Sequence, residues 1–377
     1  MRKEFEYWYP YDYRFSAKDL ISNHLTFQLF HHAAIFPKES MPRGMVVFGM
    51  GLLEGAKMSS SKGNVFLLED ALKEFGADTV RMFLVGSAEP WQDFDWRNDL
   101  VYSTRKQIER FWNTIEETRN AEHRTSGVDP WLISRLQQHI QKATEALERF
   151  QTRQALQEAF YAIEADLKWY RRRLPDGAPG GYALKELGSI WVRLLAPVIP
   201  FTCERLWSEI GGEGLVSFAP WPSADRSRID PNLELAEELL LRTIEDIESI
   251  RKVIQITPSS ITICVAPSWK KDVFASVATA PDRNTVIREI MKDEQVRRRG
   301  KAAQDAIKQC ITLIHRLPPG IVEQYLKAEM NEIEIFDNAR DFLERECSAK
   351  VHVVDAGEST LAKASAALPF KPAIVLE

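Results

Sequence analysis

A short polar and cationic loop at residues 57–64, KMSSSKGN, lies between two apolar runs and constrains the fold more than any other stretch. Residues 46–48 precede it with β-branched and aromatic side chains, and Gly49, Gly51 and Gly55 follow that run. Glycine lets a backbone approach a ligand without a Cβ in the way. Ammonium groups, rotating hydroxyls and backbone N–H groups suit phosphate oxygens. The loop therefore predicts phosphate binding, although a serine-rich run of this kind taken alone is more often a solvated surface turn.

The residues before the loop predict a parallel α/β unit. Residues 7–15 are dense in aromatic side chains and favour a strand or extended segment that enters a core. A buried helix is expected from Leu20 to Ala33, and a second strand at 45–48. In a strand–helix–strand unit, ligands bind beyond the carboxyl ends of the strands. Residues 16–19 and 49–51 both fall at those ends.

Short motifs in a fixed order carry a likeness to a known family. They are Trp8-Tyr9-Pro10, Lys18-Asp19-Leu20-Ile21, Asn23-His24-Leu25, Phe36-Pro37, Pro42-Arg43-Gly44, Leu52-Leu53-Glu54-Gly55, Gly76-Ala77-Asp78-Thr79-Val80-Arg81 and Asp93-Phe94-Asp95-Trp96-Arg97. Their order resembles that of the leucyl-tRNA synthetases, most closely the archaeal type. The loop at 57–64 resembles the KMSKS loop of class I aminoacyl-tRNA synthetases. A set of motifs in this order is hard to produce by chance.

The resemblance implies an ATP-dependent ligase that attaches leucine to tRNA through leucyl-adenylate, with ATP bound as its Mg²⁺ complex and no protein-bound zinc. It implies that Lys57, Ser60 and Lys62 act on the leaving pyrophosphate, because this step needs positioning and cations on the developing charge. The residues it implies for ATP binding are Asp19 at the ribose hydroxyls, His24 at the border of the leucine or adenylate pocket, Gly49 and Met50 along the adenine, and Lys57, Met58, Ser59, Ser60 and Ser61 in the loop.

The chain departs from the family pattern at three points. Ser60 stands where the best-known loop has its second lysine, and serine cannot stabilise charge as an ammonium does, although KMSSS-type loops occur in other active class I enzymes. Ala17 stands where glycine is commoner, which matters only if φ is positive there. We find no His-x-Gly-His (HIGH-type) motif and no inserted editing domain.

The third departure leaves open what kind of chain this is. It is expected to be a C-terminal fragment, or the C-terminal subunit of a split enzyme whose HIGH-bearing half is a separate chain, or a degenerate paralogue. The alternative function is therefore a non-catalytic tRNA-binding protein that kept the synthetase scaffold. An isoleucyl or valyl relative is disfavoured by the absence of cysteine pairs and by the C-terminal α/β domain.

Three domains are expected along the chain. We assign 1–120 to the second half of a Rossmann-type catalytic domain with stem-contact helices, joined at Gly76. Helical periodicity over 131–173, a Pro/Gly loop at 174–181 and further helices at 190–200 and 201–210 indicate an all-α bundle within 121–229, which the resemblance implies to be of the anticodon-binding type. The remaining part, 230–377, is expected to hold an amphipathic helix and an α/β domain that contacts tRNA.

The α/β domain at the C-terminal end is expected to contain three strands. Residues 260–266 alternate and are β-branched, and 332–336 and 350–354 indicate two more strands. Helices are expected between them, around 284–291, 303–314 and 338–347.

Two clusters of cations are candidates for tRNA binding. Arg171, Arg172 and Arg173 follow Trp169-Tyr170, and a cation cluster that favours the end of a helix is an equally good interpretation. The densest basic run consists of Arg297, Arg298, Arg299 and Lys301. If these cations bind tRNA phosphates, the affinity depends on salt; the alternative interpretation is a solvated loop. The run Asp95-Trp96-Arg97 fits a buried aromatic with a paired arginine and aspartate about as well as a tRNA contact.

Composition excludes several other classes of protein. The 377 residues are 45% hydrophobic and 27% charged with a net charge of −5, so a nucleic-acid partner has to use local patches. No apolar run approaches a membrane span. The four cysteines include no Cys-x-x-Cys pair, which disfavours zinc and disulfides and fits a reducing cytoplasm. His24, His31 and His32 lack carboxylate or thiolate neighbours at ligand spacing, so structural or hydrogen-bonding roles are expected.

Overall fold

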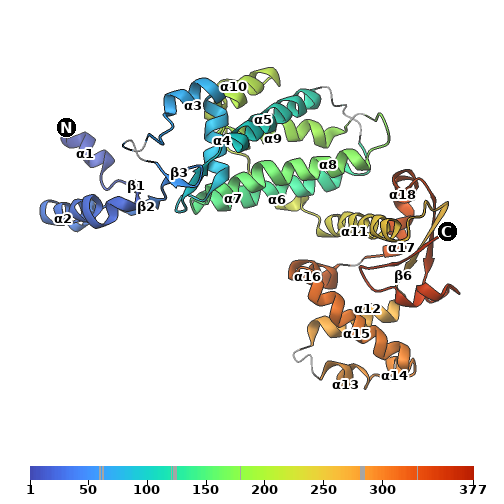
Figure 1. The fold of residues 1–377 in the computed structure, drawn as a ribbon. Coiled ribbons are helices and arrows are strands. Elements are labelled where there is room, and N and C mark those ends of the chain that lie inside the picture. Colours follow the sequence, from blue (N-terminus) through green and yellow to red (C-terminus); the bar gives the residue numbers. More distant parts are fainter. Residues whose placement is uncertain are drawn as a thin grey trace. The chain divides into compact units, whose positions relative to one another are not determined.

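The computed structural model describes residues 1–58, 61, 63–119, 121, 125–178, 180–280, 285–328 and 330–377. Contacts divide the chain into two compact units, Met1–Arg228 and Ile229–Glu377 (Figure 1). Both units are mainly helical and carry small sheets of two or three strands. The expected multidomain organisation is therefore confirmed at this coarse level.

The first unit begins with the strand–helix–strand unit that the sequence predicts. Strands β1 (Tyr13–Ala17) and β2 (Gly44–Phe48) pair in parallel. Between them lie a 3-10 turn (Lys18–Leu20), a π turn (Ile21–Leu25) and helix α2 (Thr26–Ile35). The parallel arrangement is confirmed, and the carboxyl ends of both strands meet at one edge.

The expectation that the helix of this unit is buried is wrong for this chain. Leu25 is buried, but Phe27 and Phe30 are 62% and 70% exposed. The aromatic residues at the start of the chain cover only the end of α2, where Tyr9 stacks on His32 at 5.9 Å and Phe5 on Phe36 at 5.2 Å, and leave Phe27 and Phe30 uncovered.

The extended segment expected from residue 7 is also wrong at its start. Residues Arg2–Trp8 form helix α1, supported by an Arg2 to Glu6 ion pair of 2.8 Å one turn apart. The helix ends before Tyr9-Pro10 because a residue that precedes proline disfavours helical backbone.

A second, three-stranded sheet follows, which the sequence does not predict. Strands β3 (Gly51–Leu53), β4 (Ala56–Lys57) and β5 (Phe94–Trp96) lie in the order β4-β3-β5. β3 runs antiparallel to β4 and parallel to β5. Glu54 and Gly55 make the turn between β3 and β4 with φ of 50° and 78°, as a two-residue hairpin of type I′ requires.

The helices expected on either side of Gly76 are confirmed. They are α3 (Leu68–Phe75), α4 (Ala77–Ser87) and, after the connector, α5 (Asn98–Arg119). Gly76 joins the first two with φ of 82°, a backbone angle that glycine adopts without strain. A core of buried side chains holds them together: Ala71, Phe75, Val80, Phe83, Trp96 and Val101.

The remaining helices of the first unit form a bundle. They are α6 (Asp129–Glu148), α7 (Thr152–Leu156), which continues through a π turn into α8 (Ile163–Arg173), then α9 (Tyr182–Leu195) and α10 (Pro200–Glu209). α6 packs against α7, α8 and α9, and α9 packs against α10 and α5 (Figure 1). The sequence predicts a helix from Ile190, but α9 begins eight residues earlier, at Tyr182. Ala183, Leu184 and Leu187 extend its buried face in that direction.

The motif at residues 76–81 joins α4 to the bundle. The Asp78 carboxylate accepts hydrogen bonds from the backbone N–H groups of Phe201 at 3.4 Å and Thr202 at 2.6 Å, and so caps α10. Arg81 donates to the carbonyl oxygens of Pro197 at 2.7 Å and Val198 at 2.9 Å. This motif therefore has a structural role inside the unit.

The second unit starts with the predicted amphipathic helix, α11 (Pro231–Ile254), which the Asp230 carboxylate caps. Its sheet has the order β7-β6-β8, with β6 at Ser260–Val265, β7 at Lys350–Asp355 and β8 at Ala373–Leu376. β7 runs parallel to β6 and β8 runs antiparallel to it. The strands expected at 260–266 and 350–354 are confirmed.

The strand expected at 332–336 is wrong. This segment is helix α17 (Glu332–Asn338), and its buried residues Glu332, Phe336 and Ala339 have helical spacing. The third strand is β8 instead. The other helices are α12 (Ser268–Thr279), α13 (Val286–Ile290), α14 (Glu294–Arg297), α15 (Lys301–Arg316), α16 (Pro319–Lys327) and α18 (Arg340–Cys347).

Two general features concern cysteines and membranes. Cys203, Cys264, Cys310 and Cys347 are all buried, and none of them forms a disulfide. Across the described ranges, no helix combines the length and apolar character needed to cross a membrane.

Candidate functional site

The carboxyl ends of β1 and β2 bring several of the predicted ATP-binding residues to one edge. Asp19 lies in the 3-10 turn directly after β1, and Gly49 and Met50 directly follow β2. His24 lies in the π turn that follows the 3-10 turn of Asp19. Ala17 has φ of −75°, so the glycine that is commoner in the family is not required there. Asp19 and His24 are exposed at this edge and accessible to a ligand.

Asp93, to which the sequence assigns no role, connects the two strand ends. Its Oδ1 accepts hydrogen bonds from Lys18 Nζ at 2.6 Å and from the backbone N–H of Met50 at 2.7 Å. The hydrogen bond from Lys18 and then the one from Met50 lower the pKa of Asp93. The carboxylate therefore stays ionised at neutral pH and ties the turn after β1 to the segment after β2.

The glycines that suggest a close ligand have close neighbours within the chain itself. A Cβ on Gly49 would lie 2.1 Å from the carbonyl oxygen of Gln92, and one on Gly51 would lie 2.7 Å from Met58 Cε and from a ring carbon of Phe94. At Gly49 and Gly51, residues 92–94 and Met58 therefore occupy the space next to the Cα atom, whereas at Gly55 nothing lies within 4 Å of an added Cβ.

The β3–β4 hairpin carries Lys57 into the loop. Lys57 lies opposite Leu52 and is exposed. At the turn, the backbone N–H of Gly55 donates to Asp95 Oδ1 at 2.8 Å, and Arg97 Nε donates to Asp95 Oδ2 at 2.8 Å. The bond from Gly55 and then the one from Arg97 lower the pKa of Asp95. This carboxylate therefore fixes the hairpin from which the loop departs.

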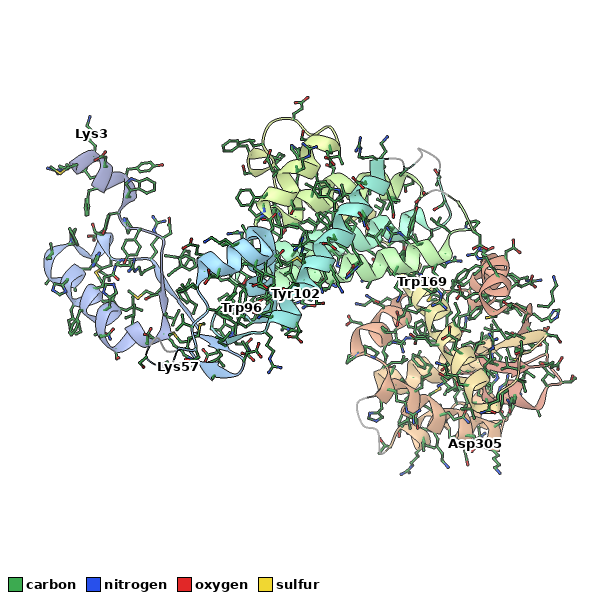
Figure 2. All side chains as sticks on the ribbon, turned by 45° about the horizontal axis from the view of Figure 1, so that its top comes forward. Lys3, Lys57, Trp96, Tyr102, Trp169 and Asp305 are labelled. Carbon is green, nitrogen blue, oxygen red and sulfur yellow. The ribbon has the colours of Figure 1, made fainter. Side chains whose placement is uncertain are left out.

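Trp96 anchors the same strand from its other side. It is 6% exposed, and its ring lies 5.1 Å from that of Phe66 and 5.2 Å from that of Phe83. Figure 2 shows Trp96 and Lys57, which come from strands of one sheet. The interpretation of Asp95-Trp96-Arg97 as a buried aromatic with a paired arginine and aspartate is confirmed.

The loop itself is described only in part. Asn64 Nδ2 donates to the Lys57 carbonyl at 2.9 Å and so links its two ends. Ser61 is described and exposed. Ser59, Ser60 and Lys62 lie outside the described residues, so their roles stay predictions.

The three histidines form hydrogen bonds with other residues of the β1–α2 region, as expected. His31 Nδ1 donates to the Phe27 carbonyl at 2.6 Å, and His32 Nδ1 donates to the Gln28 carbonyl at 2.8 Å. His24 Nε2 lies 3.3 Å from Arg14 Nη2, which donates to it. In the described part of the chain, no group of three or more histidine, cysteine, aspartate or glutamate side chains is arranged to hold a metal ion.

The first cluster of tRNA candidates is partly built into the bundle. Trp169 and Tyr170 are 8% and 0% exposed, so these rings belong to the core and offer no stacking platform. Arg171 donates to Glu117 at 2.6 Å and to Thr114 at 3.3 Å, both on α5. Arg172 lies 5.7 Å from the centre of the Trp169 ring.

The second cluster is more accessible. Arg298 pairs with Glu294 at 2.7 Å but keeps 75% of its side chain exposed. Arg299 lies over the ring of Trp269, 4.6 Å from its centre. Lys301 begins α15, whose first turn has no acidic residue.

Comparisons with known proteins first define the class. A family described as tRNA synthetases class I (M) matches residues 1–118, and the anticodon-binding domain of tRNA ligases matches residues 129–264. These matches place the chain among the class I aminoacyl-tRNA synthetases.

Individual relatives narrow the class to one family. Leucine–tRNA ligase of Methanothermobacter thermautotrophicus is 41% identical over 397 residues, covering 100% of this chain and 41% of the relative. The Pyrococcus abyssi enzyme is 41% identical over 388 residues, with 100% and 39% coverage. The chain belongs to the leucyl-tRNA synthetase family and corresponds to its C-terminal portion. It spans about two fifths of the length of these relatives.

A solved structure shares the fold. The crystal structure of a ternary complex of the Agrobacterium radiobacter enzyme LeuRS with tRNA and LeuAMS matches with a TM-score of 0.50 and 24% identity. The match covers 59% of this chain and 29% of that one.

Proposed function

We propose that this chain is the C-terminal part of a leucine–tRNA ligase and that it makes leucyl-tRNA together with the portion of the enzyme that carries the HIGH motif. The observation that carries the proposal is identity of about 41% along the whole chain to leucine–tRNA ligases. The lysine-bearing hairpin beside the carboxyl ends of β1 and β2 supports it.

The proposed first step is attack of a leucine carboxylate oxygen on the α-phosphorus of ATP. An O–P bond forms, the bond between the α-phosphorus and the bridging oxygen breaks, and pyrophosphate leaves with that electron pair. Such a step depends on in-line positioning and on cations at the leaving oxygens. Lys57, with Ser60 and Lys62, would contact the pyrophosphate, and Mg²⁺ would arrive with ATP.

The adenosine part of ATP would lie along the strand ends. We assign the ribose hydroxyls to Asp19, whose exposed carboxylate is an acceptor for a cis-diol. Gly49 and Met50 would lie along the adenine, and His24 would border the leucine or adenylate pocket. Met58, Ser59 and Ser61 would complete the ATP-binding loop.

We also propose the division into three functional parts. Residues 1–120 would be the second half of a Rossmann-type catalytic domain with stem-contact helices, 121–229 an anticodon-binding-type bundle, and 230–377 a tRNA-contacting α/β domain. The parallel β1–β2 pair, the α6–α10 bundle and the β7-β6-β8 sheet support these assignments in turn. The cytoplasm is the proposed location.

The exposed apolar face of the first part is the proposed docking surface for the HIGH-bearing portion. Phe27, Phe30 and Ile35 on α2 are 62%, 70% and 67% exposed. Large apolar side chains exposed on one helix support an interaction site.

Leucine-dependent ATP–pyrophosphate exchange tests the function. The chain is assayed alone and mixed with a HIGH-bearing N-terminal portion of a leucyl-tRNA synthetase. Exchange in the mixture supports the proposal. No exchange in either sample, with tRNA still bound, contradicts it and favours a non-catalytic tRNA-binding paralogue.

Lys57→Ala should lower the exchange rate on the order of a hundredfold and leave tRNA binding unchanged, because one charged donor to the leaving group is lost. Lys73→Ala is a matched control, since Lys73 is an exposed cation that pairs with Glu69 on α3 at 2.7 Å. Equal rates for the two variants would refute the role of Lys57.

For tRNA, we propose contacts from Arg171, Arg172 and Arg173 and, above all, from Arg297, Arg298, Arg299 and Lys301. Arg298→Glu should weaken tRNA binding and make its salt dependence shallower, because one phosphate contact is lost. Lys327→Glu is the control, since Lys327 also pairs with a glutamate one turn away, Glu323 at 2.6 Å. A titration of binding against salt with the same slope for both variants would rule out this contact.

A further inference from the structure

Two aspartates, Asp93 directly before β5 and Asp95 within it, contact both sides of the proposed adenylation site. Asp93 and Asp95 are two residues apart, as are neighbours on one face of an extended chain. Each accepts one hydrogen bond from a cationic side chain and one from a backbone N–H group. The backbone donor is Met50 for Asp93 and Gly55 for Asp95.

Backbone bonds on both sides of Asp93 fasten the same segment. The N–H of Gly49 donates to the Pro90 carbonyl at 2.7 Å, and the N–H of Phe94 donates to the Met50 carbonyl at 3.1 Å. Gly49 packs closely on Gln92, because an added Cβ would lie 2.1 Å from the Gln92 carbonyl oxygen. Residues 90–94 are therefore fastened to residues 49–50, and the Asp93 carboxylate extends this contact to Lys18.

These contacts are poorly explained as stabilisers of the fold. The side chains of Lys18 and Asp93 are 46% and 39% exposed, and ion pairs at such positions contribute little to the free energy of unfolding. What both aspartates do is fix the direction of a backbone segment. One segment is residues 49–50, which we call the adenosine wall because they are proposed to lie along the adenine. The other segment is the hairpin that leads into the lysine loop.

We propose that Asp93 and Asp95 are positioning residues for leucine activation: Asp93 sets the adenosine wall, and Asp95 sets the hairpin that directs the loop toward the pyrophosphate. The inference rests on the proposed function, because it concerns the same site. Residues 93–96 would then keep the two sides of the site aligned, and buried Trp96 anchors this segment in the core.

The two aspartates should have separable kinetic effects. Asp93→Ala should raise the KM for ATP by roughly tenfold to a hundredfold with a smaller change in kcat, because misplacement of the adenosine wall affects binding of the nucleotide. Asp95→Ala should lower kcat by a similar factor with little change in KM, because the loop acts on charge that develops in the transition state.

Conservative variants separate positioning from charge. In Asp93→Asn the remaining oxygen can still accept from Met50, and in Asp95→Asn it can still accept from Gly55, so both should recover most of the lost function. Arg97→Met should behave nearly as the wild type, because the hydrogen bond from Gly55 to Asp95 remains.

Asp12→Ala is the matched control. Asp12 pairs with Arg43 at 2.7 Å and flanks the amino ends of β1 and β2, the edge opposite to the site. Its removal should change neither KM nor kcat. Circular dichroism of each variant checks that the helices remain folded.

The assay is ATP–pyrophosphate exchange by the chain mixed with a HIGH-bearing portion. A KM effect for Asp93→Ala and a kcat effect for Asp95→Ala, both relieved by asparagine, support the inference. If the wild-type mixture is active and both alanine variants have the same KM and kcat as Asp12→Ala, the inference is overturned but the proposed function stands. No exchange by the wild-type mixture overturns the proposed function and this inference with it.

Discussion

The β1–α2–β2 region and the α6–α10 bundle belong to one unit, but the bundle buries its large apolar side chains whereas α2 exposes most of its own. In the bundle, Phe160 and Leu195 are 0% exposed and Trp191 is 1% exposed. On α2, Phe27 and Phe30 are 62% and 70% exposed. Both regions have the hydrophobic pattern of buried helices. The difference teaches that periodicity specifies an element and its apolar face, whereas burial depends on a covering layer.

The energetic consequence is that the two regions have different sources of stability. Apolar area removed from water contributes about 25 cal/mol per Å², and the bundle helices gain this against one another. Most of the α2 face gains nothing until another surface covers it. We therefore expect the bundle to fold cooperatively on its own contacts, and α2 to be stabilised by the portion of the enzyme that docks on it.

The largest expected effect contrasts two phenylalanines. Phe160→Ala in the bundle should lower the free energy of unfolding by about 3–5 kcal/mol, because a fully buried ring leaves a cavity. Phe30→Ala on α2 should change it by less than about 0.5 kcal/mol. Urea denaturation followed by tryptophan fluorescence measures both.

Phe30→Ala should instead weaken binding of the HIGH-bearing portion. A large loss of stability from Phe30→Ala in the chain alone would contradict the contrast between the two regions.

A second, smaller effect concerns the junction between α4 and α10. Asp78→Ala should lower the free energy of unfolding by about 1 kcal/mol, because the N–H groups of Phe201 and Thr202 lose their cap. Asp78→Asn should cost less, since an amide oxygen can still accept. Thermal unfolding by circular dichroism compares the two, and equal losses would show that the cap is not the cause.

The smallest expected effect is a dependence of bundle stability on pH. His139 is buried, with Nδ1 2.9 Å from Glu158 and Nε2 2.8 Å from Asp166, which also accepts from Arg135. Burial lowers the pKa of His139, but hydrogen bonds to Asp166 and Glu158 outweigh it and raise the pKa above its ordinary value of 6.5. The effect is small because these contributions oppose each other.

The sign follows from proton linkage. A raised pKa means that the folded state binds the proton more tightly, so the contribution is fully present below pH 6.5 and is lost as pH rises through the folded-state pKa. The urea concentration at the midpoint of unfolding should therefore decrease as the pH is raised from 6 to 8. His139→Gln should remove this part of the pH dependence. A midpoint that rises over this range would contradict the arrangement.

Much of the fold follows from the sequence where segments are long and periodic. The helices around Gly76, the amphipathic α11 and the parallel β1–β2 pair are examples. The hairpin and β5 escape prediction because strands of two or three residues are too short to show alternation. In α17, the alternating run at 332–336 imitates a strand, whereas the buried residues recur at helical spacing.

The candidate site is predictable only in outline. Asp19, Gly49 and Met50 can be placed because parallel strands present their carboxyl ends at one edge. Asp93 and Asp95 cannot be assigned, since their partners Lys18 and Gly55 are 75 and 40 residues away. The buried carboxylate of Glu332 is a further example, because the Tyr325 hydroxyl and the Phe370 N–H donate to its Oε1 only in the folded unit, and burial raises its pKa.

The most direct test of the contrast is amide hydrogen exchange of the chain, alone and with a HIGH-bearing portion of a leucyl-tRNA synthetase. We predict that residues 18–48 exchange quickly in the chain alone and slow markedly in the mixture. Residues 129–209 of the bundle, apart from those outside the described ranges, should be protected equally in both samples. The account would be contradicted if the amides of residues 18–48 were as protected as those of the bundle in the chain alone. It would also be contradicted if the added portion left their exchange unchanged.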